Sequence, residues 1–310
     1  FVLYVGYFFM INNEWLLENL QVQSTVFHVG RYCGSWKSSA SGHGKSSYHI
    51  VMEGGCWLHN SSPDSPVRLN QGDVVFILQD CPFILSDEQD YLKATYSPIK
   101  SMVSLSESID QSTALTCGFI TFTSPTSKVI LSFFPEVIIL RKDDDISGSI
   151  NNILAVIHKE AFSEQFSSQK LISSLAEILF FIAIRKTHIE EKITTPLDKF
   201  DLSSEFLGLF ASILRQPEKE WSIPEMATQS GLSRSWFIHR FRQVMPLTPA
   251  ETVRYLKISV ASRMIDKGHH LTDVAAAIGY LSASAFNRAF KRVTGLTPGH
   301  YRLRTRVAGK

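Results

Sequence analysis

The sequence contains few cysteines, no long apolar segment and little net charge. Its 310 residues include four cysteines, none of them in a Cys-x-x-Cys pair, and the formal net charge is +2. The longest strongly apolar stretch is residues 171–184, which is shorter than the roughly 20 residues that a membrane-spanning helix needs. We therefore expect neither a membrane-spanning chain nor a secreted, disulfide-stapled scaffold.

The beginning of the sequence leaves two interpretations open. Residues 1–11 are apolar but lack the basic flank of a signal peptide. Because Phe1 is not a start methionine, Met10 is a candidate for the biological start. The alternative is that these residues pack as an irregular strand.

The last hundred residues contain the same pattern twice. The offset between the copies is 48 residues through the glycine and 49 after it, so one residue has been inserted in a turn. Two copies of a small helical unit are implied, because such regular spacing is improbable by chance. The matched positions are Ala227, Gly231, Phe237, Phe241, Thr248 and Pro249, which correspond to Ala275, Gly279, Phe286, Phe290, Thr297 and Pro298.

The first copy predicts a helix-turn-helix. Ser222 and Glu225 have the spacing of a capping box, which starts a helix, and Gly231 ends that helix. Ser233 is expected to cap a second helix. The apolar positions of the second helix share one buried face, namely Phe237, Phe241 and Val244. A helix, a glycine turn and a second helix form the helix-turn-helix motif.

The second copy predicts the same unit after a connecting helix. Thr248 and Glu251 form another capping box, which opens a helix that runs to about Asp266. A helix of this size is roughly 27 Å long, and adjacent major-groove faces of B-DNA lie about 34 Å apart. In the second copy we expect Thr272 and Ser282 to cap the two helices. The buried face of its second helix contains Phe286, Phe290 and Val293.

The charge distribution agrees with a nucleic-acid partner. Residues 205–310 carry 16 Lys and Arg against 7 Asp and Glu, whereas residues 1–204 carry 15 against 22. Basic side chains that neutralise phosphates contribute affinity without sequence information. A solvated basic face explains such a surplus when it stands alone. Together with a duplicated helix-turn-helix, the surplus favours DNA.

Residues 205–304 resemble the AraC/XylS family of transcription regulators. The stretch that marks the resemblance most specifically runs from Ala275 to Tyr280, through Ser284, Phe286, Arg288, Phe290 and Lys291, to Thr297, Pro298, Tyr301 and Arg302. In that family both second helices enter the major groove. The resemblance therefore implies DNA contacts from the outward faces of those helices, namely Arg234, Ser235, Trp236, His239, Arg240 and Arg242, and Ala283, Ser284, Asn287, Arg288 and Lys291.

Side-chain chemistry suggests different roles within this set. Arg288 is a candidate for a guanine contact, because a guanidinium donates two hydrogen bonds to O6 and N7. Asn287 is suited to adenine, and His239 is suited to a purine acceptor. Arg234, Arg242 and Lys291 are expected to hold phosphates, beside the helix N-terminal amides. For each residue the alternative is an exposed side chain that touches nothing.

Two positions in the reading faces remain ambiguous. Trp236 either packs on the connecting helix or stacks against DNA. Ala283 stands where many relatives carry a longer side chain, which suggests that the second copy reads fewer bases directly.

The N-terminal part predicts a small antiparallel barrel or sandwich. Short apolar runs between residues 25 and 125 are separated by Gly, Pro, Ser and Asp. The pattern around His43, His49 and Trp57, followed by Gly72-Asp73 and Cys81-Pro82-Phe83, resembles the cupin-type sensor domain found in many AraC relatives. Effector contacts are therefore expected from His43, His49, Trp57 and Phe83.

A metal site in this domain is the less favoured interpretation. Cupin enzymes bind a metal through histidines on two motifs, but Phe83 stands where a histidine of the second motif is expected. The remaining spacing predicts no tetrahedral ligand set. We expect structural or effector-contacting histidines, no metal and no cofactor. We also expect the cysteines to be free thiols, with redox sensing as the alternative.

From about residue 146 the pattern becomes helical. Ile150, Ile153, Leu154 and Ile157 form an amphipathic stripe, and residues 171–184 predict a helix that is apolar on most sides. Such a helix should be covered both by the barrel and by a second surface. In AraC relatives a helix near this place often forms the dimer interface, so a homodimer through this helix is expected, with packing inside one subunit as the alternative.

These patterns combine into an α+β protein of two domains. We expect a cupin-like β-barrel over about residues 20–140 and helices over 146–188, together the effector and dimerisation domain of residues 1–190. A linker over 191–204 leads to an all-α double helix-turn-helix domain over 205–310, with its two units at about 222–244 and 272–293.

The expected function is that of an effector-responsive cytoplasmic regulator, not an enzyme. It binds double-stranded promoter DNA at two successive major-groove segments, with RNA polymerase and an unknown small-molecule effector as further partners and no membrane. The alternative is a metal-dependent cupin enzyme whose tail binds nucleic acid without specificity.

Overall fold

The computed structural model describes residues 20–308 apart from 61–64, 79, 108, 110, 126, 132–133, 145–147, 164–167, 195–200 and 246. Contacts divide it into two compact units. The barrel unit contains residues 22–121 and 135–188, and the helical unit contains residues 122–134 and 189–310. In the described part of the chain, no helix is long and apolar enough to cross a membrane.

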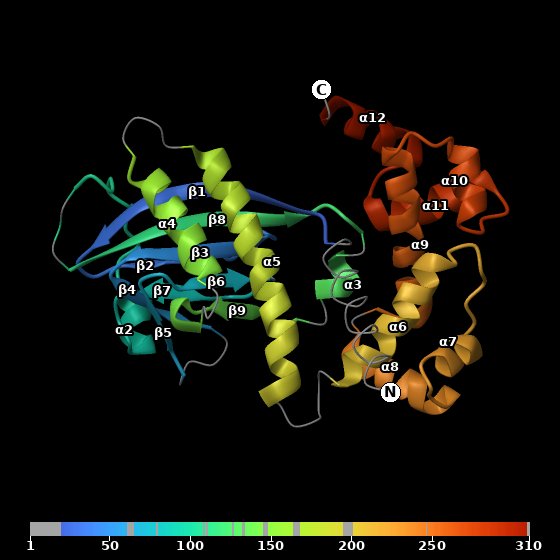
Figure 1. Ribbon diagram of the computed structural model, residues 1–310, viewed down its shortest axis with the longest axis horizontal. Helices are drawn as coiled ribbons and strands as arrows, with labels where there is room; N and C mark the ends of the chain where they lie inside the picture. Colours follow the sequence, from blue (N-terminus) through green and yellow to red (C-terminus); the bar gives the residue numbers. More distant parts are fainter. Residues whose placement is uncertain are drawn as a thin grey trace. The chain divides into compact units, whose positions relative to one another are not determined.

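The barrel unit contains two antiparallel sheets (Figure 1). The first sheet has five strands in the order β1 (Val22–Cys33), β8 (Ser112–Phe122), β3 (Ser46–Glu53), β6 (Val74–Ile77) and β9 (Val137–Leu140). The second has four strands in the order β2 (Lys37–Ser38), β7 (Ile84–Ser86), β4 (Gly55–His59) and β5 (Val67–Asn70). A short helix, α2 (Tyr91–Tyr96), follows β7. The prediction of an antiparallel β domain is confirmed.

Strand β3 lies at the centre of the first sheet and is buried on both faces. Alternate side chains of a strand point to opposite faces, so Val51 joins the apolar core between the sheets while Tyr48 faces the other way. The Tyr48 ring lies 6.5 Å from that of Phe76, which in turn lies 5.5 Å from Phe180 on a helix outside the sheet. This double coverage explains why every residue of β3 from Ser46 to Met52 is buried.

Two helices cover the outer face of the first sheet (Figure 1). They are α4 (Ser149–Ala161) and α5 (Gln169–Thr194). The predicted stripe on α4 is largely confirmed, since Ile150, Leu154 and Ile157 are buried. Helix α5 has 26 residues and extends beyond the apolar stretch at both ends.

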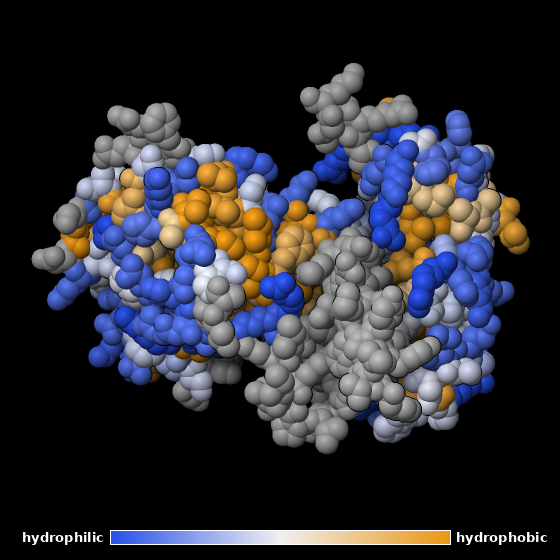
Figure 2. Space-filling model, viewed as in Figure 1, coloured by the Kyte–Doolittle hydropathy of each residue, from blue (hydrophilic) through white to orange (hydrophobic). Residues whose placement is uncertain are grey.

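The outer side of α5 is not covered within the described residues. Leu171 and Ile178 keep 39 % and 47 % of their surface exposed. Figure 2 shows apolar surface gathered over α4 and α5. The barrel therefore covers one side of this apolar helix, and the second surface that the sequence predicts is not found among the described residues of the single chain.

The helical unit consists of a duplicated helical pair around one long helix. The first half contains α6 (Asp201–Arg215), α7 (Ile223–Gln229) and α8 (Arg234–Val244), and α9 (Pro249–Asp266) connects the halves. The second half contains α10 (Leu271–Ala277), α11 (Ala283–Thr294) and α12 (Pro298–Ala308). The predicted double helix-turn-helix is confirmed.

Each half of the helical unit has its own apolar core. Phe237 and Phe241 on α8 belong to the first core, and Phe286 and Phe290 on α11 belong to the second. Helix α9 contributes to both: Leu256 lies in the first core, whereas Ile258, Ala261 and Ile265 lie in the second.

A short helix from between two barrel strands completes the first core. Helix α3 (Ser127–Leu131) lies between β8 and β9 in the sequence, but its contacts place it in the helical unit. Val129 is fully buried in the same core as Phe206, Phe237 and Phe241. This contribution has no signal in the helical repeat, so the sequence does not predict it.

The predicted caps are confirmed except for one. Ser222 and Thr248 form capping boxes with Glu225 and Glu251, and the hydroxyls of Ser233 and Ser282 accept hydrogen bonds from backbone amides of α8 and α11.

The prediction for Thr272 is wrong. Helix α10 begins at Leu271, and its N-cap is His270, which makes no side-chain cap. Leu271 packs against the second core, so the chain enters the helix before it reaches Thr272. The Thr272 hydroxyl instead lies 3.4 Å from Asp273 Oδ1.

Candidate nucleic-acid interface

Helix α8 presents a polar face opposite its buried phenylalanines. Because successive residues on a helix are 3.6 to a turn, burial of Phe237 and Phe241 turns the other side of α8 to solvent. Five of the six predicted residues are exposed and Arg240 is half-buried. The exposed five are Arg234, Ser235, Trp236, His239 and Arg242.

The aromatic groups on this face support one another. Trp236 is 50 % exposed, and its ring lies 5.6 Å from that of His239 at 26°, a stacked arrangement. His239 Nε2 lies 3.1 Å from the side-chain nitrogen of Gln243. Half of the Trp236 surface is accessible, so packing on the connecting helix and stacking against DNA both remain open for this residue.

Helix α11 repeats the arrangement with smaller side chains. Phe286 and Phe290 are buried, and the five predicted residues on the other side are all exposed. They are Ala283, Ser284, Asn287, Arg288 and Lys291. The first turn of this face therefore carries only alanine and serine, and the long polar side chains begin at Asn287.

The two helices begin in the same way. Ser233 Oγ accepts from the Trp236 amide at 3.3 Å, and Ser282 Oγ accepts from the Ala285 amide at 3.2 Å. Each cap satisfies one of the amides that a helix leaves free at its N-terminus, and the others remain available to an anion. Helix α9 connects the two helical pairs, and its 18 residues make it roughly 27 Å long.

The turns before the two helices differ by one exposed residue. Gly231 and Gly279 have φ of 68° and 79°, and the amides of Leu232 and Tyr280 donate to the carbonyls of Ala227 and Ala275 at 2.9 Å. Leu232 and Tyr280 therefore occupy equivalent places, and both pack on their cores. The inserted residue is Leu281, which is fully exposed at 105 %.

Leu281 is not among the residues that the sequence predicts for this surface. The change in offset from 48 to 49 residues located an insertion in this turn. That signal did not identify which residue was additional, because Tyr280 and Leu281 are both apolar.

The four residues predicted to contact an effector do not converge on one place. His49 and Phe83 lie in the barrel interior with ring centres 5.3 Å apart. His43 is exposed beside Phe119, and Trp57 stacks under the Arg68 guanidinium on the other side of β4. Their role as effector contacts stays a prediction.

The barrel interior contains neutral groups. Complete burial lowers the pKa of His49 to about 3, so this histidine is uncharged at neutral pH. Its Nδ1 lies 3.1 Å from Cys117 Sγ. Burial raises the pKa of the Cys56 and Cys117 thiols well above the usual range, which keeps both protonated. The prediction of free thiols is confirmed for all four cysteines.

No metal-binding constellation is found among the residues that the structure describes. No three His, Cys, Asp or Glu side chains of this part of the chain lie close enough together to hold an ion. The barrel-interior His49 has Cys117, Ser47 and the Phe83 ring as neighbours.

A cavity of about 320 Å³ lies instead between β3 and α4. Its lining consists of Ile50, Val51, Met52, Gln71, Gly72, Lys142, Asn151, Leu154, Ala155 and His158. None of the four predicted effector residues is part of this lining.

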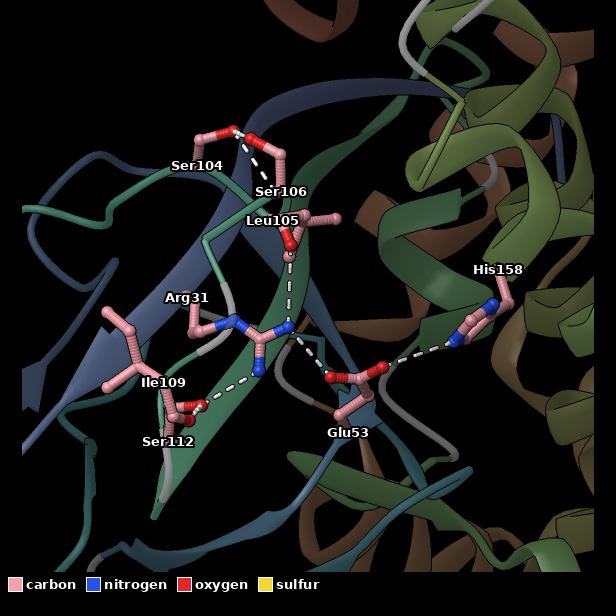
Figure 3. A network of polar contacts seen from close by, with 8 residues as sticks. All are labelled: Arg31, Glu53, Ser104, Leu105, Ser106, Ile109, Ser112 and His158. Atoms are coloured by element: carbon pink, nitrogen blue, oxygen red, sulfur yellow. Dashed lines mark hydrogen bonds and ion pairs between the residues drawn. The ribbon is translucent and has the colours of Figure 1, made fainter.

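A polar network begins at the edge of this cavity (Figure 3). His158 Nε2 lies 3.8 Å from Glu53 Oε1, and Glu53 Oε2 accepts a hydrogen bond from the buried Arg31 at 2.8 Å. Arg31 also donates to Ser112 Oγ at 2.8 Å and to the Leu105 carbonyl at 3.5 Å. The network connects α4 to β1, β3 and β8.

Comparison with known proteins agrees with this division of the chain. A family model described as a cupin matches residues 14–188, and one described as a helix-turn-helix domain matches residues 226–304. A putative AraC-like transcription regulator of Streptomyces lividans is 23 % identical, with 82 % of this chain and 86 % of that protein covered. The transcriptional regulator MtrA of Neisseria gonorrhoeae is also 23 % identical, with 82 % and 85 % covered.

Solved structures give a weaker likeness. The structure of ToxT from Vibrio cholerae shares 14 % identity and has a TM-score of 0.35, with 91 % of this chain and 98 % of that chain covered. The DNA-binding domain of AdpA, solved in complex with a target DNA, shares 24 % identity over 32 % of this chain and 91 % of that chain, with a TM-score of 0.30.

The helical unit presents two capped helices with exposed polar faces, and each helix follows a glycine turn and lies on its own core. The barrel unit has two sheets, and the cupin model matches more than half of the chain. The relatives that match across both parts are named as transcription regulators. The chain belongs to the AraC family of DNA-binding transcription regulators, with an N-terminal cupin domain and a C-terminal double helix-turn-helix domain.

Proposed function

We propose that this regulator reads a defined sequence in double-stranded promoter DNA by placing α8 and α11 in two successive major-groove segments. The observation that carries the proposal is the pair of exposed faces on these helices, each opposite a buried pair of phenylalanines. Recognition helices of helix-turn-helix proteins contact base edges through their N-terminal residues. The basic surplus of residues 205–310 would supply the phosphate contacts that position the protein.

The two helices would read DNA unequally. Arg288 and Asn287 are the candidates for direct base contacts on α11, to guanine and adenine. On α8, His239 is the candidate for a purine contact, and the exposed part of Trp236 would pack on sugar or a thymine methyl. Arg234, Arg242 and Lys291 would hold phosphates.

Selection of bound DNA from a random library, followed by a DNase footprint on the selected site, tests this proposal. We expect a defined consensus whose protected region spans two successive major-groove segments about one helical turn, roughly 34 Å, apart. Binding without a consensus would contradict it, and so would a footprint confined to one segment.

Substitution of Arg288 separates base reading from phosphate binding. Arg288→Ala should lose discrimination at one base position by about 1–3 kcal/mol. Arg292→Ala is the matched control, because this substitution removes the same charge from the same helix. The Arg292 guanidinium lies 3.8 Å from Glu251 of α9, so it is not a candidate for a base contact. Competition binding on single-base variants of the selected site measures both. A uniform loss for Arg288→Ala across all sequences would reassign Arg288 to phosphate.

We infer further that the barrel unit responds to a small-molecule effector and that no reaction is catalysed. The cavity between β3 and α4 supports the effector site, because it has the volume of a small ligand site and touches the network of Arg31, Glu53 and His158 (Figure 3). Ligand would act by shifting the population between arrangements of different DNA affinity. DNA affinity that stays constant across a library of small molecules would remove the support for this inference.

The proposal further includes a homodimer, RNA polymerase as a partner and a location in the cytoplasm. The exposed apolar side of α5, with Leu171 and Ile178, supports a homodimer through residues 171–184. Sedimentation of Ile178→Lys against the unmodified protein tests it, and the same mass for both would contradict it. Transcription in a purified system with RNA polymerase tests the remaining partner.

The predicted linker over residues 191–204 lies partly outside the described residues.

A further inference from the structure

Leu281 stands out on the surface of the helical unit. At 105 % it is the most exposed of the large apolar side chains in the described part of the chain. It immediately precedes Ser282, the N-cap of α11. An isolated exposed leucine needs no explanation by itself, so its position must decide whether it has a role.

The comparison of the two copies shows that Leu281 is free of packing. A residue just before an N-cap often packs against the helix and fixes the direction of the chain. In copy one that place belongs to Leu232, which packs on the first core. In copy two Tyr280 fulfils this task, with its ring 6.0 Å from that of Phe286. Leu281 is therefore additional to everything that the fold requires.

The surroundings of Leu281 are those of the proposed reading surface. The N-terminal end of a recognition helix is the part that meets base edges, and Leu281 lies at that end of α11. The next exposed side chains are Ser282, Ala283 and Ser284, so no long polar group competes with the leucine for a base. Arg288 and Lys291 follow on the same helix and carry the charge that attracts DNA.

We propose that Leu281 reads a thymine through its C5-methyl group in the major-groove segment occupied by α11. The thymine methyl is the apolar feature of that groove, and apolar side chains recognise it by contact. Contact would remove the leucine from water, which stabilises the complex in proportion to the apolar surface buried. This inference rests on the proposed function, because it names one further base contact of the same reader.

The test uses full-length protein and removes one methyl group from the DNA. Each thymine in the α11 segment of the selected site is replaced singly by deoxyuridine, which lacks only the methyl. We expect one replacement to weaken binding of the unmodified protein about fourfold, the value for one buried methyl group. Leu281→Ala should bind the thymine site about as weakly as the unmodified protein binds that deoxyuridine site. It should also no longer distinguish the two DNAs.

Two further variants control the experiment. Leu303→Ala removes an exposed leucine, 62 % exposed, from α12, outside both recognition helices, and should keep the fourfold preference for thymine. Leu281→Met keeps an apolar side chain of similar volume and should retain most of the preference. Circular dichroism should be unchanged for all three variants, because neither Leu281 nor Leu303 is buried.

Each other outcome overturns the inference. A selected α11 segment without a thymine, or one in which no methyl matters, leaves Leu281 nothing to read. A Leu281→Ala protein that still distinguishes thymine from deoxyuridine assigns the methyl to another residue. A uniform loss on all DNAs assigns Leu281 to the backbone, and unchanged DNA binding with lost transcription assigns it to a protein partner. If instead library selection yields no consensus at all, the proposed function fails before this test begins.

Discussion

At the residue scale, the two turn glycines differ in what surrounds them. Gly231 and Gly279 both have positive φ, a conformation that side chains other than glycine adopt at a cost. A Cβ on Gly231 would meet nothing within 4 Å, whereas a Cβ on Gly279 would lie 2.3 Å from the Glu218 carbonyl oxygen. The backbone before α7 thus packs directly on the turn of the second copy.

This difference predicts unequal costs for the same substitution. Gly231→Ala should lower the free energy of unfolding by about 1 kcal/mol, because only backbone strain is added. Gly279→Ala should cost about 2–4 kcal/mol, because the methyl group also collides with a backbone that cannot move aside easily. Chemical denaturation of the two variants measures the difference, and equal costs would contradict the close packing against Glu218.

At the scale of elements, the capping box of α9 makes the stability of the connecting helix dependent on pH. The Glu251 carboxylate accepts hydrogen bonds from the backbone amide and the hydroxyl of Thr248 at 3.1 and 2.8 Å. These bonds hold the pKa of Glu251 below the ordinary glutamate value of 4.5. A group whose folded pKa is depressed stabilises the protein above its unfolded pKa and loses that contribution as pH falls through the folded pKa.

Glu251→Gln should therefore be less stable than the unmodified protein at neutral pH. The difference should shrink as pH falls below about 4.5, because the carboxylate of the unmodified protein then becomes protonated. Glu220→Gln is the matched control, since Glu220 is exposed and caps no helix. Thermal unfolding between neutral pH and pH 4 measures both variants, and a constant difference across that range would contradict the role of the charge.

The elements of the helical unit could largely be predicted from the sequence, since they depend on local signals. Ser222, Ser233, Thr248 and Ser282 mark helix starts by themselves, and the spacing of the phenylalanines defines the buried faces. Thr272 failed as a cap because packing of the neighbouring Leu271 determined the start of α10. Tertiary packing overrides local preference in such cases.

Of the candidate sites, the exposed helix faces could be predicted from the sequence, whereas the arrangement of the effector residues could not. The exposed faces of α8 and α11 follow from helical periodicity, so every residue predicted there is accessible to some degree. The effector residues are predicted from resemblance to a motif, and a motif does not fix which side of a strand faces inward. Trp57 and His49 therefore point to different surroundings.

At the scale of the whole molecule, the first core of the helical unit is assembled from distant parts of the chain. Val129 of α3 is separated by more than seventy residues from its neighbour Phe206, and both are fully buried. Long-range contacts of this kind leave no periodic trace in the sequence. The helix-turn-helix repeat alone, residues 226–304 by the family match, thus lacks one wall of the core behind α8.

Truncation of Val129 should loosen that core within the full-length protein. Val129→Ala should cost about 1–3 kcal/mol and speed hydrogen exchange in α6 and α8, because a cavity is left beside their phenylalanines. Exchange in β3 should stay unchanged. Val156→Ala, at a position 44 % exposed on α4, should have almost no effect. Unchanged exchange in α8 would contradict the assignment of Val129 to this core.

The two separate cores at either end of α9 have a consequence for evolution. A substitution that weakens the core under α11 leaves the core under α8 intact. In the proposed mode of binding, one of these helices can therefore change or lose its target while the other keeps the protein on DNA. Descendants of such a regulator can acquire new promoters one half-site at a time, without passing through a form that binds nothing.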